Sequence, residues 1–456
     1  MALPEGVNKR YASIAGIILV ALWLWVAFDR PYSFSKHTTW SQYANVPTST
    51  QEDTEKANNP ESKPPTPDVF DEPEVDSDAI RNMCGGTQWN SSLVFRCDNS
   101  AGTVANVRNS ILICVRHAIE VGANIILPRI LNPDGDHEAG RSLLYWYTHP
   151  FDFMFDQDHF VNSLKRSCPD MSIYEKWEKV PFPPNNIRPP IITVHPEKIG
   201  QRDGENWHSA FKRLVSAMIR PDEDTFPIVI ELARPAPIYD IFSDGAAFVG
   251  DFGSILQFRK DVRDLANKSL MKLSDIYNLS FDSEKPPQRF NFFGMHLLTE
   301  EEPLGCTEGW PCIDREYGLY AEETKGYLEQ AQASNSSVIY VSSHRQDEIS
   351  RLKADATPLG IQVYDKWSLL ENVDDQNKLN GLTKDQKQLV DYLVLLKAAQ
   401  FAGIGHSSFS WNVALKRHTM SEKSNFTIGS HIFQDSLSKL WGKIDSEKTL
   451  YHSMWP

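Results

Sequence analysis

The stretch Asp391–Arg417, DYLVLLKAAQFAGIGHSSFSWNVALKR, carries the strongest structural signal in the chain. Its apolar pattern predicts a helix, a short buried strand, the turn Gly405–Ser410 and a second helix. The glycine permits a tight turn, and small hydroxyl side chains precede a helix N-terminus, which favours negative charge. The stretch therefore predicts a phosphate site after a strand or, in the simpler interpretation, only a helix capped by Ser407.

Alternating helix and strand patterns continue from Arg81 onward and predict an α/β fold with parallel sheets. The expected strands are 124–128, 191–194, 228–232, 292–297, 337–341, 361–364 and 401–405, and the expected helices are 104–121, 205–219, 254–273, 317–333 and 384–399. Ligands of open parallel sheets bind beyond the carboxyl ends of the strands. The loops after these strands are therefore the places where chemistry is expected.

The N-terminal part has the composition of a membrane anchor and a stem. Residues 11–28 contain no charged side chain and follow Lys9 and Arg10, which predicts a transmembrane signal anchor after a cytoplasmic tail at 1–10. A cleavable signal peptide is the alternative. Residues 29–80 are rich in Pro, Ser, Thr and acidic residues and predict a disordered stem. The remainder would then be lumenal, in a single-pass type II protein of the Golgi or endoplasmic reticulum membrane.

Cysteines and glycosylation sequons agree with that placement, because an oxidising lumen allows disulfides and N-glycans. Cys306 and Cys312 predict a small disulfide-closed loop, and Cys84 with Cys97 is the next plausible pair. Cys114 and Cys168 either join the disulfide framework or are reduced core residues. Asn-x-Ser/Thr sequons occur at Asn90, Asn267, Asn278, Asn335 and Asn425.

Composition limits the classes of function. The chain of 456 residues has a net charge of −14, which argues against nucleic acid as a partner. No Cys or His spacing and no Asp-x-Asp signature predicts a metal site. A hinge-like segment at 280–289 divides the folded part into two α/β domains, expected at 81–285 and 286–456.

The stretch Asp391–Arg417 is similar to the C-terminal motif of the GDP-fucose protein O-fucosyltransferases, in which an Asp-containing helix leads into a strand and a G-x-x-S-S/T-F-S turn. The resemblance implies a GT-B fold of two Rossmann-like domains, in which the C-terminal domain, 286–456, mainly binds the nucleotide sugar. It implies a GDP-sugar donor and no separate cofactor. It also implies that Ser407, Ser408 and Phe409 contact the phosphates and the adjoining nucleoside, and that Asp391 lies at the guanosine end. Ser410 is assigned instead to helix capping.

Two further segments resemble the same family. NFFGMHLLTEEE, residues 291–302, looks like a strand ending in G-x-H-x-R and an acidic pair: His296 matches the histidine, whereas Leu298 replaces the arginine that engages the diphosphate. Glu301, or its neighbour Glu300, is the candidate base for the acceptor hydroxyl. Residues 102–128 resemble the N-terminal loop G-G-x-x-N-Q-R, helix and strand of the family. The carried-over residues are Gly102, Asn106 and Arg108.

VIYVSSHRQDEISRL, residues 338–352, resembles the strand of the family that runs into a small-residue loop at the nucleotide. Ser343 is the expected donor contact there. A departing diphosphate needs a cation, and either Arg345 or Arg108 is expected to supply what Leu298 cannot. The alternative for Arg345 is a solvated loop residue.

Together the resemblances imply an inverting, metal-independent transfer of fucose from GDP-fucose to a hydroxyl of a protein or glycan. Leu298 supports a second hypothesis, that catalysis is impaired and the protein is a binding or scaffold protein of the same fold. A third hypothesis keeps the enzyme and changes the nucleotide sugar, because phosphate loops recognise a diphosphate better than the sugar attached to it.

Overall fold

The computed structural model describes residues 68–98, 103–131, 148–182, 190–195, 199–219, 227–233, 240–277, 290–299, 319–405, 407–422, 435–442 and 452–456. The predicted tail and anchor at 1–28 lie outside these residues. No helix in the described part is long and apolar enough to span a membrane. The described residues belong to one compact unit, Thr66–Pro456.

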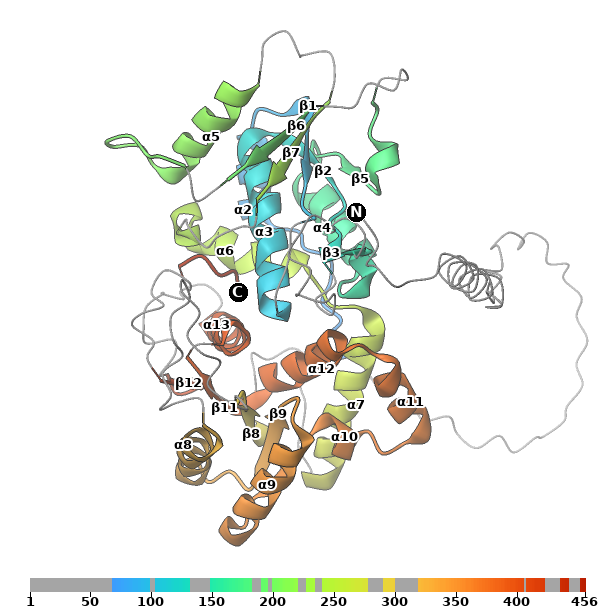
Figure 1. Ribbon diagram of the computed structural model, residues 1–456, viewed down its shortest axis with the longest axis vertical. Helices are drawn as coiled ribbons and strands as arrows, with labels where there is room; N and C mark the ends of the chain where they lie inside the picture. The colour runs from blue at the N-terminus through green and yellow to red at the C-terminus, as the bar shows by residue number, and fades with distance from the viewer. Residues whose placement is uncertain are drawn as a thin grey trace, which may run out of the picture. The chain divides into compact units, whose positions relative to one another are not determined.

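Two five-stranded sheets organise this unit, and all their strand pairs are parallel (Figure 1). The order is β5-β2-β1-β7-β6 in the first sheet and β10-β9-β8-β11-β12 in the second. The first sheet contains β1 (Asn90–Arg96), β2 (Ala123–Ile126), β5 (Ile173–Tyr174), β6 (Ile191–Val194) and β7 (Ile228–Leu232). The second contains β8 (Phe290–His296), β9 (Val338–Ser342), β10 (Gln362–Tyr364), β11 (Ala398–Ile404) and β12 (Ser438–Trp441).

Helices connect these strands, as parallel pairing requires. They are α2 (Asp78–Gly85), α3 (Val104–Val121), α4 (Gln157–Ser167), α5 (Trp207–Met218), α6 (Ala246–Phe252), α7 (Lys260–Tyr277), α8 (Tyr320–Ala333), α9 (Gln346–Ala356), α10 (Lys366–Leu369), α11 (Val373–Gly381), α12 (Lys384–Leu396) and α13 (Ser408–Glu422). Short 3-10 turns are η1 (Phe151–Phe153), η2 (Trp177–Lys179), η5 (Ile241–Asp244), η6 (Gly253–Ile255) and η7 (Thr357–Leu359), and β3 (Ile130–Leu131) pairs antiparallel with β4 (Thr148–His149).

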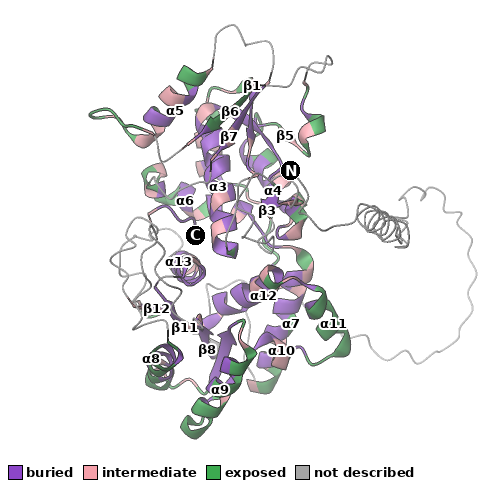
Figure 2. Cartoon of the chain, viewed as in Figure 1, coloured by how far each residue is buried: buried purple, intermediate pink, exposed green. Residues whose placement is uncertain are grey.

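The helix α3 is the centre of the first half, and Figure 2 shows it buried along nearly its whole length. It ends at Gly122, whose φ of 67° is the left-handed conformation that glycine adopts without strain. A Cβ atom at Gly122 would stand 1.9 Å from the carbonyl oxygen of Gln88. Glycine is therefore required where the chain leaves α3 and passes the segment before β1.

The α/β fold with parallel sheets confirms the sequence-based expectation of fold class, with two corrections. The predicted stem at 29–80 is wrong for its last residues: Phe70 and Ile80 are 6% and 0% exposed in the core, and α2 begins at Asp78. The central strand β1 was not predicted, because Asn90, Ser91 and Ser92 interrupt the apolar pattern. Burial by β2 and β7 on both sides outweighs this weak local signal.

The predicted domain boundary at 285/286 assigns α7 to the N-terminal domain, and the structure shows α7 in contact with both halves. Arg263 of α7 forms ion pairs with Asp68, Asp71 and Asp156 of the first half. The helix α7 packs against α12 and α10. Lys268 on α7 forms an ion pair with Asp375 of α11. The domain boundary therefore stays a prediction, and the predicted hinge at 280–289 lies outside the described residues.

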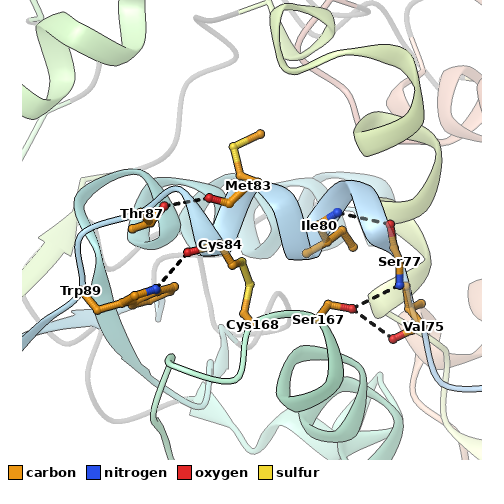
Figure 3. Close-up of a disulfide and its surroundings, with 9 residues drawn as sticks. All are labelled: Val75, Ser77, Ile80, Met83, Cys84, Thr87, Trp89, Ser167 and Cys168. Carbon is orange, nitrogen blue, oxygen red and sulfur yellow. Dashed lines mark hydrogen bonds between the residues drawn. A yellow bond between two sulfur atoms is a disulfide. The ribbon is translucent and has the colours of Figure 1, made fainter.

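Two disulfides stabilise the first half. Cys84 of α2 bonds to Cys168 at the end of α4 (Figure 3), and Cys97 after β1 bonds to Cys114 of α3. The predicted pair Cys84–Cys97 and the reduced state considered for Cys114 and Cys168 are therefore wrong. Pairing depends on which segments the fold brings together, and sequence separation does not show this. Cys306 and Cys312 lie outside the described residues.

Candidate functional site

The order of the strands places one crossover point in each sheet. From β1 the chain continues to β2 on one side and later to β7 on the other, and from β8 it continues to β9 on one side and later to β11 on the other. Ligands of open parallel sheets bind at such points, beyond the carboxyl ends of the strands. In the first sheet the chain passes from the end of β1 into α3, and in the second sheet it passes from the end of β11 into α13.

These two helix N-termini contact each other. The Thr103 Oγ1 and Ser408 Oγ atoms are 3.0 Å apart, although the residues are 305 positions apart in sequence. Thr103 is the N-cap residue of α3, but its side chain makes no capping hydrogen bond within the helix. The first-turn N–H groups of a helix lack intrahelical partners and carry partial positive charge. The contact therefore brings two positive helix ends to one point.

The start of α13 is fixed by a serine cap and a close approach to β11. The Ser407 hydroxyl accepts a hydrogen bond from the Ser410 N–H at 3.3 Å, so Ser407 caps the helix and Ser410 does not. A Cβ atom at Gly403 would lie 2.4 Å from the Ser410 Oγ, so glycine permits this approach. The Ser410 hydroxyl lies 2.7 Å from the His296 Nδ1 and joins α13 to the end of β8. His296 itself is 4% exposed.

Two predicted donor contacts are buried inside the second half. The Phe409 ring packs at 4.5 Å from the His296 ring and 5.7 Å from the Tyr392 ring, measured between centroids. Asp391 accepts hydrogen bonds from Lys366 Nζ at 2.6 Å and from the Tyr340 hydroxyl at 2.7 Å. Burial raises the pKa of Asp391, against the opposing effect of Lys366. Both side chains support the site from within, and their contact with a nucleoside stays a prediction.

Arg108 lies in the second turn of α3 and is 3% exposed. Its guanidinium donates to the main-chain oxygens of Trp455 and Gly253, each at 2.7 Å, and to that of Pro456. Burial lowers the pKa of Arg108. These bonds support a structural role in place of the predicted catalytic one. Asn106, two residues before Arg108 in α3, is half-buried.

Arg345 follows β9, which pairs parallel with β8. It therefore lies beyond the same edge of the sheet as the end of β8. The backbone N–H of Arg345 donates to the Ser343 Oγ at 3.1 Å, and its guanidinium pairs with Asp347 at 2.9 Å and Glu348 at 3.6 Å. Glu348 in turn accepts a hydrogen bond from Thr299, the residue after Leu298. The Arg345 guanidinium is thus connected through the Glu348 carboxylate to Thr299, next to Leu298.

The structure therefore brings together Ser407, Ser408, Phe409 and His296, and connects them to the start of α3 through Thr103. Gly102 and Glu301 lie outside the described residues. The sequence interpretation missed Thr103, although a threonine directly before an apolar helical run is an N-cap signal. In the described part, no group of three or more His, Cys, Asp or Glu side chains is arranged to hold a metal ion.

Two cavities in the described part lie away from this point. A cavity of about 50 Å³ borders Arg108, Tyr392 and Lys416, on the inner side of α3 and α13. A larger groove of about 570 Å³ runs between α7 and the α10–α11 region and is lined by ion pairs such as Lys268–Asp375. Apart from Arg108, neither contains a predicted site residue.

Comparisons with known proteins found no matching family model and no matching curated protein. Among solved structures, POFUT1 in complex with GDP-fucose aligns with a TM-score of 0.47 at 14% identity, over 78% of this chain and 99% of that chain. POFUT1 in complex with GDP gives 0.45 at 14%, over 74% and 96%. A mutant of Arabidopsis thaliana FUT1 in complex with GDP gives 0.37 at 10%, over 75% and 71%. At these low values the functional interpretation rests on the motifs and the geometry.

Proposed function

We propose that the protein is a GT-B-like glycosyltransferase whose GDP-sugar donor places its diphosphate between the N-termini of α3 and α13. The contact between Thr103 and Ser408 carries this proposal, because it joins two segments that each resemble donor loops of the O-fucosyltransferases. Two helix N-termini at one point form a strong anion-binding arrangement. The motif resemblance favours GDP-fucose as the donor.

The proposed reaction is an inverting displacement at the anomeric carbon. The acceptor oxygen bonds to that carbon, the bond from the carbon to the β-phosphate oxygen breaks, GDP leaves, and the acceptor proton goes to a carboxylate, for which Glu301 is the candidate. Negative charge grows on GDP in the transition state, so the helix ends and a cation lower the barrier. We assign the cation to Arg345, because Arg108 is bound to main-chain oxygens.

The acceptor class is a hydroxyl of a protein or glycan, and the proposed location is the lumenal side of the Golgi or endoplasmic reticulum membrane. The disulfides Cys84–Cys168 and Cys97–Cys114 support an oxidising compartment. The membrane association depends on residues 11–28 and remains part of the proposal.

A second candidate function is donor binding without transfer. It rests on Leu298, which stands where the family carries an arginine, and on the salt bridges that hold Arg345 beside Asp347 and Glu348. Removing one preorganised charged donor commonly lowers a rate by about 100- to 1000-fold. In this case the protein would bind GDP-sugars and release GDP from them only at the uncatalysed rate.

The experiment that separates the two candidates measures GDP release from GDP-fucose by the full-length protein in detergent, with GDP-mannose and UDP-sugars as donor controls. The transferase proposal predicts enzyme-dependent release of GDP from one GDP-sugar and no enzyme-dependent release of UDP from UDP-sugars. Tight binding with no release above the uncatalysed rate would support the binding protein, and release from every donor alike would contradict GDP-sugar specificity.

A further inference from the structure

The segment His452–Pro456 packs between the two halves of the described unit, and Figure 1 marks this end of the chain beside α3, α6 and α13. Trp455 is fully buried, with its ring 4.8 Å from the Phe252 ring and 5.9 Å from the Phe248 ring of α6. The main-chain oxygen of His452 accepts a hydrogen bond from the Ile241 N–H at 2.8 Å. The segment is therefore anchored by an aromatic side chain and by its backbone.

Asparagine side chains from both helices bind the backbone of this segment. Asn109 of α3 accepts from the Trp455 N–H at 2.9 Å and donates to the Ser453 oxygen at 2.9 Å. Asn412 of α13 donates to the Trp455 oxygen at 2.8 Å, and the same oxygen accepts from Arg108 of α3 at 2.7 Å. One carbonyl oxygen thus joins α3 to α13.

These bonds lie close to the ends of the helices that form the candidate site. Arg108 and Asn109 come five and six residues after Thr103, and Asn412 comes four residues after Ser408. At a rise of about 1.5 Å per residue, the bonds lie roughly 6 to 9 Å along each helix from the contact between Thr103 and Ser408. A shift of one helix relative to the other would break these buried hydrogen bonds before it could separate the helix ends by much.

We infer that His452–Pro456 is a strap that holds the N-termini of α3 and α13 at the separation needed for the donor diphosphate. This inference rests on the proposed function and adds positioning residues to it: Asn109, Asn412 and Trp455 touch no donor atom and act through the two helices. Preorganised donors bind more tightly because less ordering is needed on binding. By linkage, a bound nucleotide must stabilise the strap as much as the strap stabilises the bound nucleotide.

Two substitutions remove single strap bonds and leave the neighbouring ones. Asn412→Asp keeps the Oδ1 that accepts from the Tyr392 hydroxyl at 2.7 Å but loses the donor to Trp455. Asn109→Asp keeps the acceptor for the Trp455 N–H and loses the donor to Ser453. The control is Asn206→Ala, which removes the N-cap bond of α5 to the Ser209 N–H and should cost similar stability away from the strap.

The test measures GDP affinity of the full-length protein by calorimetry and the hydrogen exchange of the Trp455 and Ile241 amides. Each strap substitution should weaken GDP binding by about 5- to 10-fold, as expected for one lost buried hydrogen bond, whereas Asn206→Ala should change it by less than about twofold. In the unmodified protein, saturating GDP should slow exchange of both amides by at least about fivefold.

The outcomes are distinguishable. If the unmodified protein binds GDP but exchange of Trp455 and Ile241 does not respond to it, the strap inference is wrong and the proposed function stands. The same conclusion follows if both folded strap variants bind GDP as tightly as the unmodified protein. If the unmodified protein binds no GDP, the proposed function and the strap inference both fall. The exchange measurement needs no variant, so it decides the question even where a substitution prevents folding.

Discussion

At the scale of single residues, the proposed transfer reaction depends most on Leu298 and Arg345. Leu298 contributes no charge, and its backbone N–H donates to the buried carboxylate of Glu323 at 3.3 Å. Arg345 is the cation connected to this place through Glu348 and Thr299. Because Arg345 is already paired with acidic side chains, the proposed donor diphosphate would have to compete with Asp347 for its guanidinium.

Replacing Arg345 tests its assignment. Arg345→Gln should lower the rate of GDP release from GDP-fucose by about 100-fold while changing GDP affinity far less, because the cation acts mainly on charge that develops in the transition state. Arg345→Lys should recover part of the rate. The measurement is steady-state GDP release, with Arg351→Gln in α9, the helix that begins directly after Arg345, as the control. An unchanged rate for Arg345→Gln would remove Arg345 from the mechanism.

At the scale of elements, the ion-pair cluster around Asp244 ties η5 to α3 and α5. Arg116 of α3 donates to Asp244 at 2.7 Å and 2.8 Å, and the His208 Nε2 of α5 lies 3.2 Å from it. Burial raises the pKa of Asp244, but the hydrogen bonds from His208 and Arg116 outweigh this effect and lower the pKa from 3.8 to about 2. A lowered folded-state pKa stabilises the fold above the unfolded value.

The stability that Asp244 contributes should therefore be lost as the pH falls through the range from 3.8 toward 2. Asp244→Asn should reduce the free energy of unfolding by about 2 kcal/mol at pH 7, and the difference from the unmodified protein should shrink as the pH falls through this range. Urea unfolding at several pH values measures it. Asp264→Asn, which breaks the exposed Lys260–Asp264 pair, should cost less than about 1 kcal/mol. An equal loss of unfolding free energy in both variants would show that the buried ion pairs of Asp244 stabilise the protein no more than an exposed pair does.

The two disulfides should differ in their effect on the site. Cys97–Cys114 joins the end of β1 to α3 and closes the segment that leads to Thr103, whereas Cys84–Cys168 joins α2 to the end of α4. Replacing either pair by alanine should lower stability by about 2 to 4 kcal/mol. Only the Cys97→Ala, Cys114→Ala protein should also bind GDP more weakly in calorimetry. Equal GDP affinities in the two double variants would show that the disulfide between β1 and α3 does not affect the candidate site.

At the scale of the whole molecule, the exposure of the sequons bears on the proposed lumenal location. Asn90 and Asn335 are exposed, and Asn335 has a φ of 52° in the turn between α8 and β9, whereas Asn267 is 6% exposed within α7. Asn278 and Asn425 lie outside the described residues. Only an accessible asparagine can carry a glycan in the folded protein.

We expect the full-length protein expressed in eukaryotic cells to lose mass on treatment with an N-glycosidase. Ser337→Ala and Ser92→Ala, which destroy the sequons of Asn335 and Asn90, should each remove one glycan. Ser269→Ala, which destroys the sequon of Asn267, should remove none. The readout is electrophoretic mobility before and after digestion. A protein without any glycan would contradict the lumenal placement.

The local sequence pattern was sufficient to predict α3, β6, β7 and the turn before α13. Their apolar periodicity and the turn residues at their ends agree with the tertiary structure. It was insufficient for β1, whose burial comes from neighbouring strands, and for Cys84–Cys168, whose partners are 84 residues apart. Arg108 shows the same limit. Its motif predicted a ligand contact, while its partners Trp455 and Pro456 lie almost 350 positions away.

The most direct test of a donor site between α3 and α13 is calorimetric titration of the full-length protein with GDP-fucose and GDP, compared with UDP, for the unmodified chain and for Ser408→Ala. Removing the Ser408 hydroxyl takes away its contact with Thr103 at the meeting point of α3 and α13. We expect GDP and GDP-fucose to bind to one site and UDP to bind at least about tenfold more weakly. Ser408→Ala should weaken GDP binding by about 5- to 10-fold. Absence of GDP binding at millimolar concentration, or unchanged affinity in Ser408→Ala, would contradict a donor site between these helices.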